Sequence, residues 1–333
     1  MNRKVIPIFF AVDDNYVKIM HVALRSLVAN ASKKFNYNIH VICEGLTKEN
    51  QASIKSFEDD NFKCFIEDLS KEAGERAKLM EGKYYNGRAT YYRAFIPRLF
   101  PQYDKILYLD SDIVLNGDVS ELFNTDIKDN YLIAVLDGIV AATPIFLEYV
   151  HNFLNQYKYF NAGVLVMNSK ALRAMDFETK FFDLLSKFKF EIAPDQDCFQ
   201  ILCMKRVKLV GDEWNRMSLL GVDPKRSVDQ IKLVHFNLAA KPWILDNCAY
   251  GELWWKHAKN TQFYNELLNI KKTVTPKDFE KSHGQLNAIM NLAAELSKGP
   301  SIYEILADID GVHVHDCSAC GACCAKRKAG AKK

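Results

Sequence analysis

Two aspartates that directly follow an apolar segment are the first residues in this sequence that could do chemistry. Residues Ile106–Leu109 read Ile-Leu-Tyr-Leu, and Asp110-Ser-Asp112 comes next. Such a run is typical of a buried strand in an α/β sheet, and ligands of open α/β sheets bind at the carboxyl ends of the strands. Carboxylates placed there suit Mg²⁺ or Mn²⁺ carrying a diphosphate. The alternative is a surface turn, because the chain repeats this spacing at Asp195-Gln-Asp197 and Asp308-Ile-Asp310.

A second polar group, Asp13-Asp14-Asn15, follows the apolar segment Val5–Val12. A carboxylate and an amide at this place could bind a ribose or a base edge. The alternative is that they cap the next helix. No Gly-x-Gly-x-x-Gly follows the segment, which disfavours a nicotinamide or flavin dinucleotide site.

Polar residues further along the chain could act at the same site. His235 ends a short apolar segment and could complete a metal site, or it could be a hydrogen-bonded core histidine. Lys241 could meet a phosphate or lie in solvent. Asn161 lies among apolar neighbours, where a buried amide needs either a ligand or a nearby loop as its partner. Asp195-Gln-Asp197 lies at a predicted helix start, where acids also match the helix dipole.

Six segments occur in an order and spacing that is far more specific than any one of them: Phe10-Ala-Val-Asp-Asp-Asn-Tyr16, Tyr91-Tyr-Arg93, Leu107-Tyr-Leu-Asp-Ser-Asp112, Tyr159-Phe-Asn-Ala-Gly-Val164, Asp195-Gln-Asp197, and His235 followed by Lys241-Pro-Trp243. With these segments, which span roughly residues 5 to 243, the chain resembles the retaining glycosyltransferases of family 8. That family includes bacterial lipopolysaccharide galactosyl- and glucosyltransferases and glycogenin.

The resemblance implies an α/β fold, the glycosyltransferase A-type fold, with a mostly parallel twisted sheet, helices on both faces and a C-terminal helical segment. It implies a hexosyltransferase that moves glucose or galactose from UDP-glucose or UDP-galactose to a glycan or glycolipid acceptor, such as lipopolysaccharide. The resemblance also implies that Mn²⁺, or Mg²⁺, is held by Asp110, Asp112 and His235. Donor contacts are implied for Ala11, Asp13, Asn15, Arg93, Asp110, Ser111, Asp137, Asn161, Ala162 and Lys241.

The catalytic residues that the resemblance implies are Asp195 and Gln196, facing the sugar at the reacting carbon. A double displacement needs a carboxylate nucleophile, and the Gln196 amide is a poor one. We therefore expect a front-face route through an oxocarbenium-like ion pair. Family members commonly carry a glycine-centred turn between the histidine and the lysine, whereas Phe236–Ala240 has no glycine. If that turn meets a phosphate, Leu238 must adopt a strained geometry. Thr143–Tyr157 matches no motif of the family, and we expect this segment to set acceptor choice.

The pattern around these motifs alternates strands with helices, which predicts a mostly parallel sheet. Expected strands cover residues 5–12, 37–43, 62–66, 106–109, 131–136, 160–167, 207–210 and 231–236. Expected helices cover residues 16–29, 47–57, 90–99, 195–204, 286–296 and 301–307, with a further helix capped by Ser169. We expect a catalytic domain over residues 1–245, a helical extension over 246–312, and a flexible Cys-rich basic tail over 313–333.

Composition narrows the function classes. The net charge of the 333 residues is only +3, and no basic stripe is interleaved with aromatics, so nucleic acid is not expected as a partner. No apolar run is long enough for a spanning helix, and the first apolar segment reads as a strand and not as a signal peptide. Five scattered cysteines are typical of reduced, buried thiols. We therefore expect a cytoplasmic protein, with peripheral contact at the inner face of the membrane as a further expectation.

The tail leaves three interpretations open. The spacing Cys-x₂-Cys-x₂-Cys from Cys317 to Cys323 fits part of a zinc or iron–sulfur ligand set. Cysteines beside Lys326-Arg-Lys328 could instead carry a lipid near a basic patch, or the tail could be disordered without a ligand. Two alternatives to the transferase also stay open, a sugar nucleotidyltransferase and a nucleotide-sugar-binding protein without turnover. The acceptor could belong to lipopolysaccharide core, a glycoprotein, teichoic acid or capsule.

Overall fold

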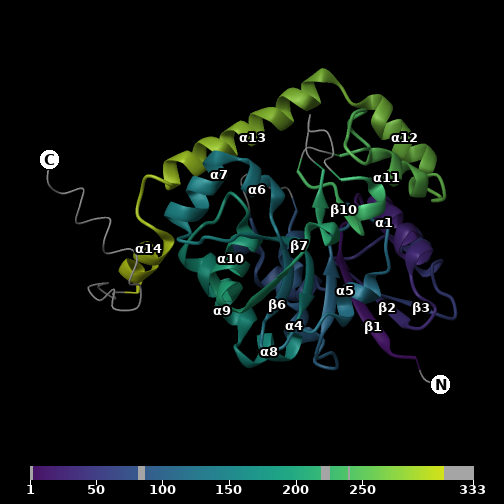
Figure 1. Cartoon of the computed structure of the whole chain (residues 1–333), viewed down its shortest axis with the longest axis horizontal. Helices are drawn as coiled ribbons and strands as arrows, with labels where there is room; N and C mark the ends of the chain where they lie inside the picture. The colour runs from purple at the N-terminus through teal and green to yellow at the C-terminus, as the bar shows by residue number, and fades with distance from the viewer. Residues whose placement is uncertain (1–2, 82–86, 219–225, 239–240, 311–333) are drawn as a thin grey trace, which may run out of the picture.

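A seven-stranded sheet forms the centre of this computed structural model, which describes residues 3–81, 87–218, 226–238 and 241–310 (Figure 1). The larger sheet contains β1 (Val5–Ala11), β2 (Asn36–Cys43), β3 (Phe62–Asp68), β4 (Ile106–Leu109), β6 (Leu132–Leu136), β7 (Phe160–Met167) and β8 (Val207–Val210). A smaller sheet contains β5 (Ile113–Leu115), β9 (Arg216–Met217) and β10 (Leu233–His235).

Helices join and cover the strands. The α-helices are α1 (Val17–Asn30), α2 (Lys48–Lys55), α3 (Ser70–Glu75), α4 (Ile96–Leu99), α5 (Val119–Asn124), α6 (Gly138–Ala142), α7 (Pro144–Glu148), α8 (Ser169–Ala174), α9 (Phe177–Lys187), α10 (Pro194–Cys203), α11 (Gly251–Ala258), α12 (Tyr264–Thr273), α13 (Pro276–Leu296) and α14 (Ile302–Ile309). Shorter helical turns are η1 (Ala77–Met80), η2 (Ala89–Ala94), η3 (Tyr149–Phe153), η4 (Met204–Arg206), η5 (Asp212–Trp214) and η6 (Val228–Gln230).

The order of the larger sheet is β3-β2-β1-β4-β7-β6-β8, and the predicted mostly parallel sheet is confirmed. Neighbours are parallel throughout except at β7, which runs antiparallel to both β4 and β6. Because β1 and β4 are parallel, their carboxyl ends lie at one edge. The reversed β7 begins at that same edge, where the Asp110 backbone N–H donates to the Gly163 carbonyl at 2.7 Å. The strands β1, β4 and β7, which lie far apart in the sequence, therefore bring their residues together at this edge of the sheet.

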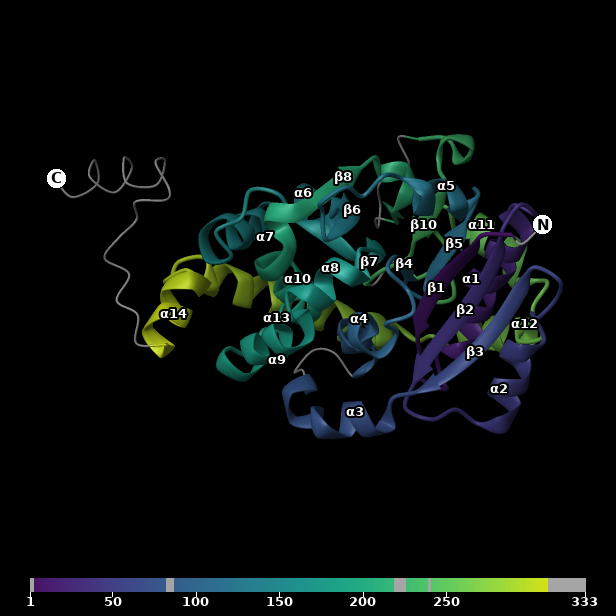
Figure 2. The ribbon, with the colours of Figure 1, turned by 90° about the horizontal axis from the view of Figure 1, so that it is seen from below.

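Both faces of the sheet are buried, as predicted. Phe9 lies in an apolar cluster with residues of α8, α9 and α10, whereas Ile8 and Phe10 lie in a second cluster with residues of α1, α2 and α5. This alternation along β1 follows from the period of two residues in a strand. Helices accordingly cover both sides of the sheet (Figure 2).

The smaller sheet brings His235 to the edge of the larger sheet where β4 ends. β10 pairs antiparallel with β5, which places His235 opposite Ile113. The Phe236 N–H then donates to the Asp112 carbonyl at 2.8 Å. Since β5 follows Asp112 directly, this pairing fixes the imidazole beside the acidic pair, although more than a hundred residues separate them in sequence.

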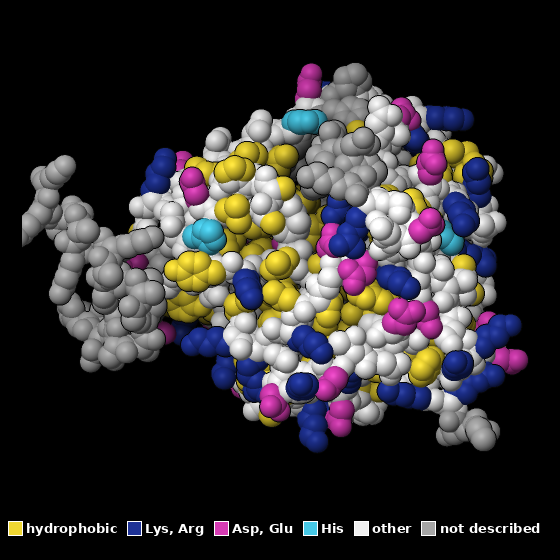
Figure 3. Space-filling model, in the orientation of Figure 1, with side chains coloured by type: hydrophobic (Ala, Val, Ile, Leu, Met, Phe, Trp, Pro, Cys, Tyr) yellow, Lys and Arg dark blue, Asp and Glu magenta, His cyan; other side chains and the backbone are white. Residues whose placement is uncertain are grey.

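Helix α13 runs from α12 toward α7 and α14, across one end of the molecule (Figure 1). A capping box starts it, in which Thr275 and Asp278 exchange side-chain and backbone hydrogen bonds. The helices predicted near its end and at residues 301–307 are both confirmed. Hydrophobic side chains gather on the face of the molecule below α13, over α6 and α7 (Figure 3).

Several predicted elements have different ends in the structure; the strand expected over residues 231–236, for example, covers only Leu233–His235. Two further differences concern helices. The helix that Ser169 was expected to cap begins at Ser169 itself, and Asn168 caps it by accepting from the Ala171 N–H. Residues 90–99 form two short helices, η2 and α4, and not one, because Pro97 lacks the N–H that a continuous helix needs there.

Two expectations from composition can be compared with the described residues. Within them, no helix has the length and apolar character needed to cross a bilayer. The five scattered cysteines, Cys43, Cys64, Cys198, Cys203 and Cys248, are buried and form no disulfide. The cysteine cluster of the tail lies outside the described residues.

Candidate active site

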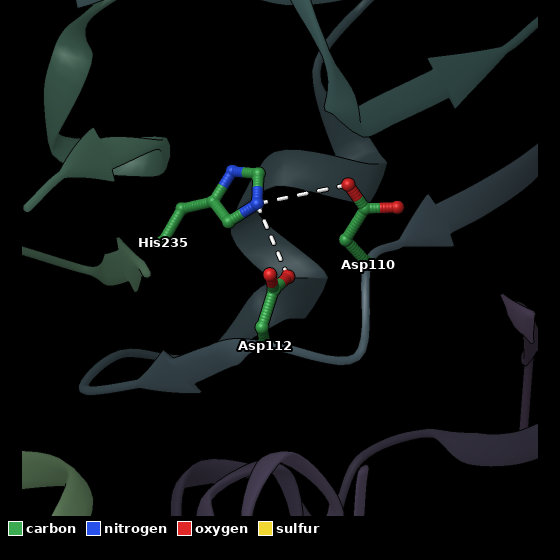
Figure 4. Close-up of side chains that lie close together, drawn as sticks. All are labelled: Asp110, Asp112 and His235. Atoms are coloured by element: carbon green, nitrogen blue, oxygen red, sulfur yellow. Dashed lines mark ion pairs between the residues drawn. The ribbon is translucent and has the colours of Figure 1, made fainter. Parts of the chain in front are cut away.

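Asp110, Asp112 and His235 converge at the edge where β4 ends (Figure 4). The His235 Nε2 atom lies 3.2 Å from Asp112 Oδ1 and 3.6 Å from Asp110 Oδ2. One ligand atom from each residue lies within 4.8 Å of the other two. The structure thus brings together the three residues that the sequence named as metal ligands.

The donor atoms of this group fit a divalent cation. His235 is 1% exposed, and its Nδ1 lies 3.0 Å from Asn215 Oδ1. The Asn215 amide nitrogen donates to Asn161 Oδ1 at 2.9 Å, so the Asn215 oxygen must face the ring and Nδ1 carries the proton. Nε2 then presents a lone pair, is buried and has no hydrogen-bond partner. Two carboxylates and an imidazole lone pair are three acceptors, and oxygen and imidazole ligands suit Mn²⁺.

Gly163 makes room for this convergence. A Cβ on this residue would lie 2.3 Å from His235 Cε1 and 2.5 Å from Asp110 Oδ2. The backbone of β7 therefore passes so close to both groups that no side chain fits. A glycine in a strand permits such a close approach of the backbone, here against the acidic pair.

Arg93 connects the acidic pair to the start of α10. This guanidinium is 4% exposed and lies 2.9 Å from Asp110 Oδ1 and 3.3 Å from Asp195 Oδ2. It also donates to the Ala162 carbonyl and stacks over the Tyr108 ring at 4.3 Å. Burial opposes the charge of Arg93, but the neighbouring carboxylates outweigh burial and raise its pKa. Burial likewise raises the pKa of Asp195, against the opposing effect of Arg93.

Lys241 lies on the other side of the acidic pair. Its ammonium group pairs with Asp112 Oδ2 and lies beside the Tyr16 hydroxyl. Burial alone would raise the pKa of Asp112, but the Lys241 ammonium group beside it holds that pKa well below its usual range. Burial raises the pKa of Tyr16 to about 12. The edge thus has a buried ammonium group in direct contact with one of its two acids.

Both polar atoms of the Gln196 amide form hydrogen bonds. Its oxygen accepts from the Ala162 N–H at 2.8 Å, and its nitrogen donates to Asp137 Oδ2 at 3.1 Å. The same Asp137 oxygen accepts from Asn161 at 3.1 Å. Because a carboxylate only accepts and a backbone N–H only donates, these partners fix the orientation of the amide. Asp137 Oδ1 caps α6 by accepting from the Ile139 and Val140 N–H groups.

Asp197 points away from this edge into the core. It is fully buried and accepts from the hydroxyls of Tyr149 at 2.9 Å and Tyr159 at 2.6 Å. Burial raises its pKa to about 7, against the opposing effect of these two hydrogen bonds. Its role in the structure is to anchor two tyrosine rings beneath the site.

These residues surround a cavity of about 540 Å³, a size common for small-molecule sites. Most of the sequence-named residues line it, namely Ala11, Asp13, Arg93, Asp110, Ser111, Asp112, Asp137, Asn161, Asp195, Gln196, His235 and Lys241. Two do not. Asn15 is exposed outside the lining, and Ala162 contributes only backbone contacts, to Arg93 and Gln196. Asp13 also accepts from the Tyr16 N–H, so it supports the start of α1 as well.

Sequence reasoning missed three residues that shape the site. Asn215 sets the imidazole tautomer, Tyr16 lies beside Lys241, and the Tyr108 hydroxyl donates to Asp110 Oδ1 at 2.9 Å. Tyr16 and Tyr108 are parts of motifs that were singled out for their acids. No signal in the sequence marks Asn215, because its partner lies on a strand that follows a long connection.

Comparison with known proteins agrees with this architecture. The sequence model of glycosyl transferase family 8 matches residues 7–246. A lipopolysaccharide 1,2-glucosyltransferase of Escherichia coli is 26% identical over 299 residues, which cover 84% of this chain and 84% of that protein.

Two solved structures share the fold. The galactosyltransferase LgtC, in complex with donor and acceptor sugar analogues, has a TM-score of 0.63 and 23% identity, over 83% of this chain and all of LgtC (100%). The bifunctional glycosyltransferase WbbM has a TM-score of 0.69 and 23% identity, over 81% of this chain but only 52% of WbbM. These likenesses confirm the predicted A-type fold. Because the family model covers most of the sequence, the chain belongs to glycosyl transferase family 8 and is a sugar-transferring enzyme, as its motifs predicted.

Proposed function

We propose that this enzyme is a metal-dependent, retaining hexosyltransferase. It transfers glucose or galactose from UDP-glucose or UDP-galactose to a hydroxyl of a glycan or glycolipid. The observation that carries this proposal is the convergence of Asp110, Asp112 and the orphaned Nε2 atom of His235 in one cavity with the Gln196 amide. A cation site can stabilise the negative charge that develops on the diphosphate as a sugar–diphosphate bond breaks, and a fixed amide beside it can stabilise the developing cation.

Each group has a role in this proposal. Mn²⁺, or Mg²⁺, would be held by the two carboxylates and the imidazole, and when bound it would neutralise charge on the leaving diphosphate. Lys241 adds a second positive charge at the same edge, which would also stabilise the leaving diphosphate. Arg93 holds Asp110 and Asp195 in place through its two ion pairs.

Gln196 and Asp195 would act on the sugar. The amide dipole of Gln196 stabilises the developing cation at the anomeric carbon, and Asp195 orients the sugar hydroxyls. The departing phosphate takes the proton of the acceptor hydroxyl. The remaining donor contacts are assigned to Ala11, Asp13, Ser111, Asp137 and Asn161, all of which line the cavity.

The identity of both substrates is supported by similarity. The relative from Escherichia coli is a lipopolysaccharide glucosyltransferase and LgtC is a galactosyltransferase, which supports a hexose donor and a glycan or glycolipid acceptor. We further propose that the enzyme works in the cytoplasm, in peripheral contact with the inner face of the membrane when the acceptor is a glycolipid. The catalytic unit is assigned to residues 1–245, with residues 246–312 as a helical extension.

Release of UDP from a panel of UDP-sugars, with and without Mn²⁺, tests the proposal. We expect Mn²⁺-dependent UDP release from UDP-glucose or UDP-galactose. The D110N variant should lose about 10²-fold or more, as expected for a lost electrostatic stabiliser. The matched control is D308N, because Asp308-Ile-Asp310 repeats the spacing at the exposed C-terminal end of α14.

The same assay separates the two alternatives. Release of pyrophosphate from a sugar phosphate and a nucleotide would indicate a nucleotidyltransferase. Tight donor binding with no UDP release at any acceptor would indicate a binding protein. Either result would refute the transferase.

A further inference from the structure

The cavity has two halves of opposite chemistry. One half lies at the carboxyl ends of β1 and β4 and contains the acidic pair, His235 and Lys241. The other half, which we call the apolar half, is lined by Ile139, Val140, Phe146, Val150, Leu286 and Ile289. These side chains come from α6, α7, η3 and α13, and the face of the molecule over α6 and α7 shows a gathering of hydrophobic side chains (Figure 3).

The apolar half is only partly closed, although Phe146, Val150 and Ile289 in its wall belong to the buried core. Ile139, Val140 and Leu286 are half-buried, and all three line the cavity. Packed cores leave few voids larger than a water molecule, whereas a cavity that combines apolar walls with a few convergent polar groups is typical of a ligand site. Even the tyrosine in this wall contributes its ring, because the Tyr149 hydroxyl is bound to the buried Asp197.

Asp137 connects the apolar half to Gln196, the residue that the proposed function assigns to the reacting carbon. One of its carboxylate oxygens binds the Gln196 amide and the other caps α6. The two residues whose N–H groups receive this cap, Ile139 and Val140, both line the cavity. A group bound against them lies next to whatever Gln196 faces. Sugar hydroxyls would be left without partners there, because burying a polar group without a hydrogen bond is unfavourable.

We propose that the apolar half binds an alkyl or aryl group that the acceptor carries within about one sugar unit of the hydroxyl that receives the hexose. This inference rests on the proposed function and specifies its acceptor class, a lipid-linked or aromatic glycoside. It also gives a reason for the expected role of the segment Thr143–Tyr157, which forms α7 and η3 and supplies Phe146 and Val150 to the wall.

Binding of simple glycosides tests the inference. Dissociation constants of methyl, phenyl and octyl β-glucosides and β-galactosides are measured by calorimetry on the full chain with UDP and Mn²⁺, with the octyl compounds below their micelle concentration. We expect the octyl or phenyl glycoside to bind at least about tenfold more tightly than the methyl glycoside, as burial of several methylene groups predicts. An octyl preference points to a lipid-linked acceptor and a phenyl preference to an aromatic one.

Two variants of α13 locate the effect. Leu286 lines the cavity, whereas Leu292 is also half-buried on the same helix but is absent from the lining. L286Q should reduce the preference for the apolar glycoside to about threefold or less, since a polar amide replaces much of the apolar contact, and L292Q should retain it. Equal binding of methyl and apolar glycosides in the wild type would overturn the inference, as would a preference that L286Q leaves intact.

Failure of the proposed function gives a different result. UDP release without acceptor reports the transferase chemistry and does not depend on the apolar half. If the wild type releases UDP but shows no preference among glycosides, only the acceptor inference fails. If no UDP-sugar is cleaved, the proposed function fails, and the binding measurement still decides whether the apolar half takes an apolar group.

Discussion

Replacement of Asn215 by leucine tests how the cation site is prepared. Asn215 is 2% exposed, and its oxygen receives the His235 Nδ1–H at 3.0 Å. Leucine has the same branching at Cγ and the same number of side-chain heavy atoms but no hydrogen-bonding atom, so N215L leaves the buried Nδ1 without a partner. N215L also removes the hydrogen bond that Asn215 donates to Asn161 Oδ1. That oxygen still accepts from the Gly163 N–H at 2.9 Å. The imidazole is therefore the group most affected.

The size of the effect follows from that one lost partner. A buried donor that loses its acceptor costs about 1–3 kcal/mol, and the ring can now place its proton on Nε2, the atom that faces the two acids. Changes to hydrogen bonds behind metal-binding histidines typically weaken metal affinity about 10–100-fold. We expect N215L to raise the dissociation constant for Mn²⁺ by that factor, with a smaller change in UDP release at saturating Mn²⁺.

Mn²⁺ binding is measured directly, by calorimetry or by the electron paramagnetic resonance signal of the free ion. The matched control is Q200L, which removes a buried amide whose nitrogen donates to the Phe160 carbonyl at 3.2 Å and which is absent from the cavity lining. Mn²⁺ affinity within about threefold of wild type in N215L, or an equal loss in Q200L, would refute the reasoning.

Three further predictions concern the site and the stability of the fold. G163A should abolish Mn²⁺-dependent UDP release while the circular dichroism spectrum stays native. The new methyl group would lie 2.3 Å from His235 Cε1 and 2.5 Å from Asp110 Oδ2. Activity within about tenfold of wild type would contradict this prediction, since the loss of even one electrostatic stabiliser reduces the rate by more than that. L238G should stabilise the protein against urea by about 0.5–1 kcal/mol, because Leu238 has a φ of 50° and is 44% exposed. Relief of the left-handed strain then outweighs the backbone entropy that glycine adds to the unfolded chain. A lower urea midpoint would contradict this prediction. Burial lowers the pKa of His21 from 6.5 to about 4, so between these pH values the unfolded chain binds a proton that the folded chain does not, and stability should fall by about 3 kcal/mol as pH drops through that window. H21Q should flatten this part of the pH profile of urea unfolding, and an unchanged profile would count against the assignment.

The elements that the sequence predicted well are those whose local pattern and final environment agree. β1 and β4 read as apolar runs and are buried on both faces, and Thr47 caps α2 by accepting from the Asn50 N–H. The direction of β7 could not be read in the same way. Its eight residues are all buried, and a run of that kind has the same pattern whether its neighbours are parallel or antiparallel.

Site residues could be predicted from the sequence where they belong to a recognisable motif. Residues that only orient a motif residue, from a distant part of the chain, could not. Asp110 and Asp112 follow a strand directly, so their place at the edge could be inferred from the sequence. The tautomer of His235 depends on Asn215, which is brought to it by the pairing of β9 with β10. Such a long-range pairing leaves no local periodicity. Leu238 was recognised only because the resemblance supplies a glycine for comparison, and its φ of 50° agrees with the strain expected there.

The state of the carboxylates bears on the route by which the sugar is transferred. A double displacement needs a carboxylate that is free to attack from beneath the sugar. Asp137 already accepts from the Gln196 and Asn161 amides and caps α6, and Asp195 is paired with Arg93 at 3.3 Å. Asp197 is buried beneath two tyrosine hydroxyls. Each would have to give up its partners to act as nucleophile, whereas the fixed amide of Gln196 needs no rearrangement to stabilise a cation, and we therefore favour the front-face route.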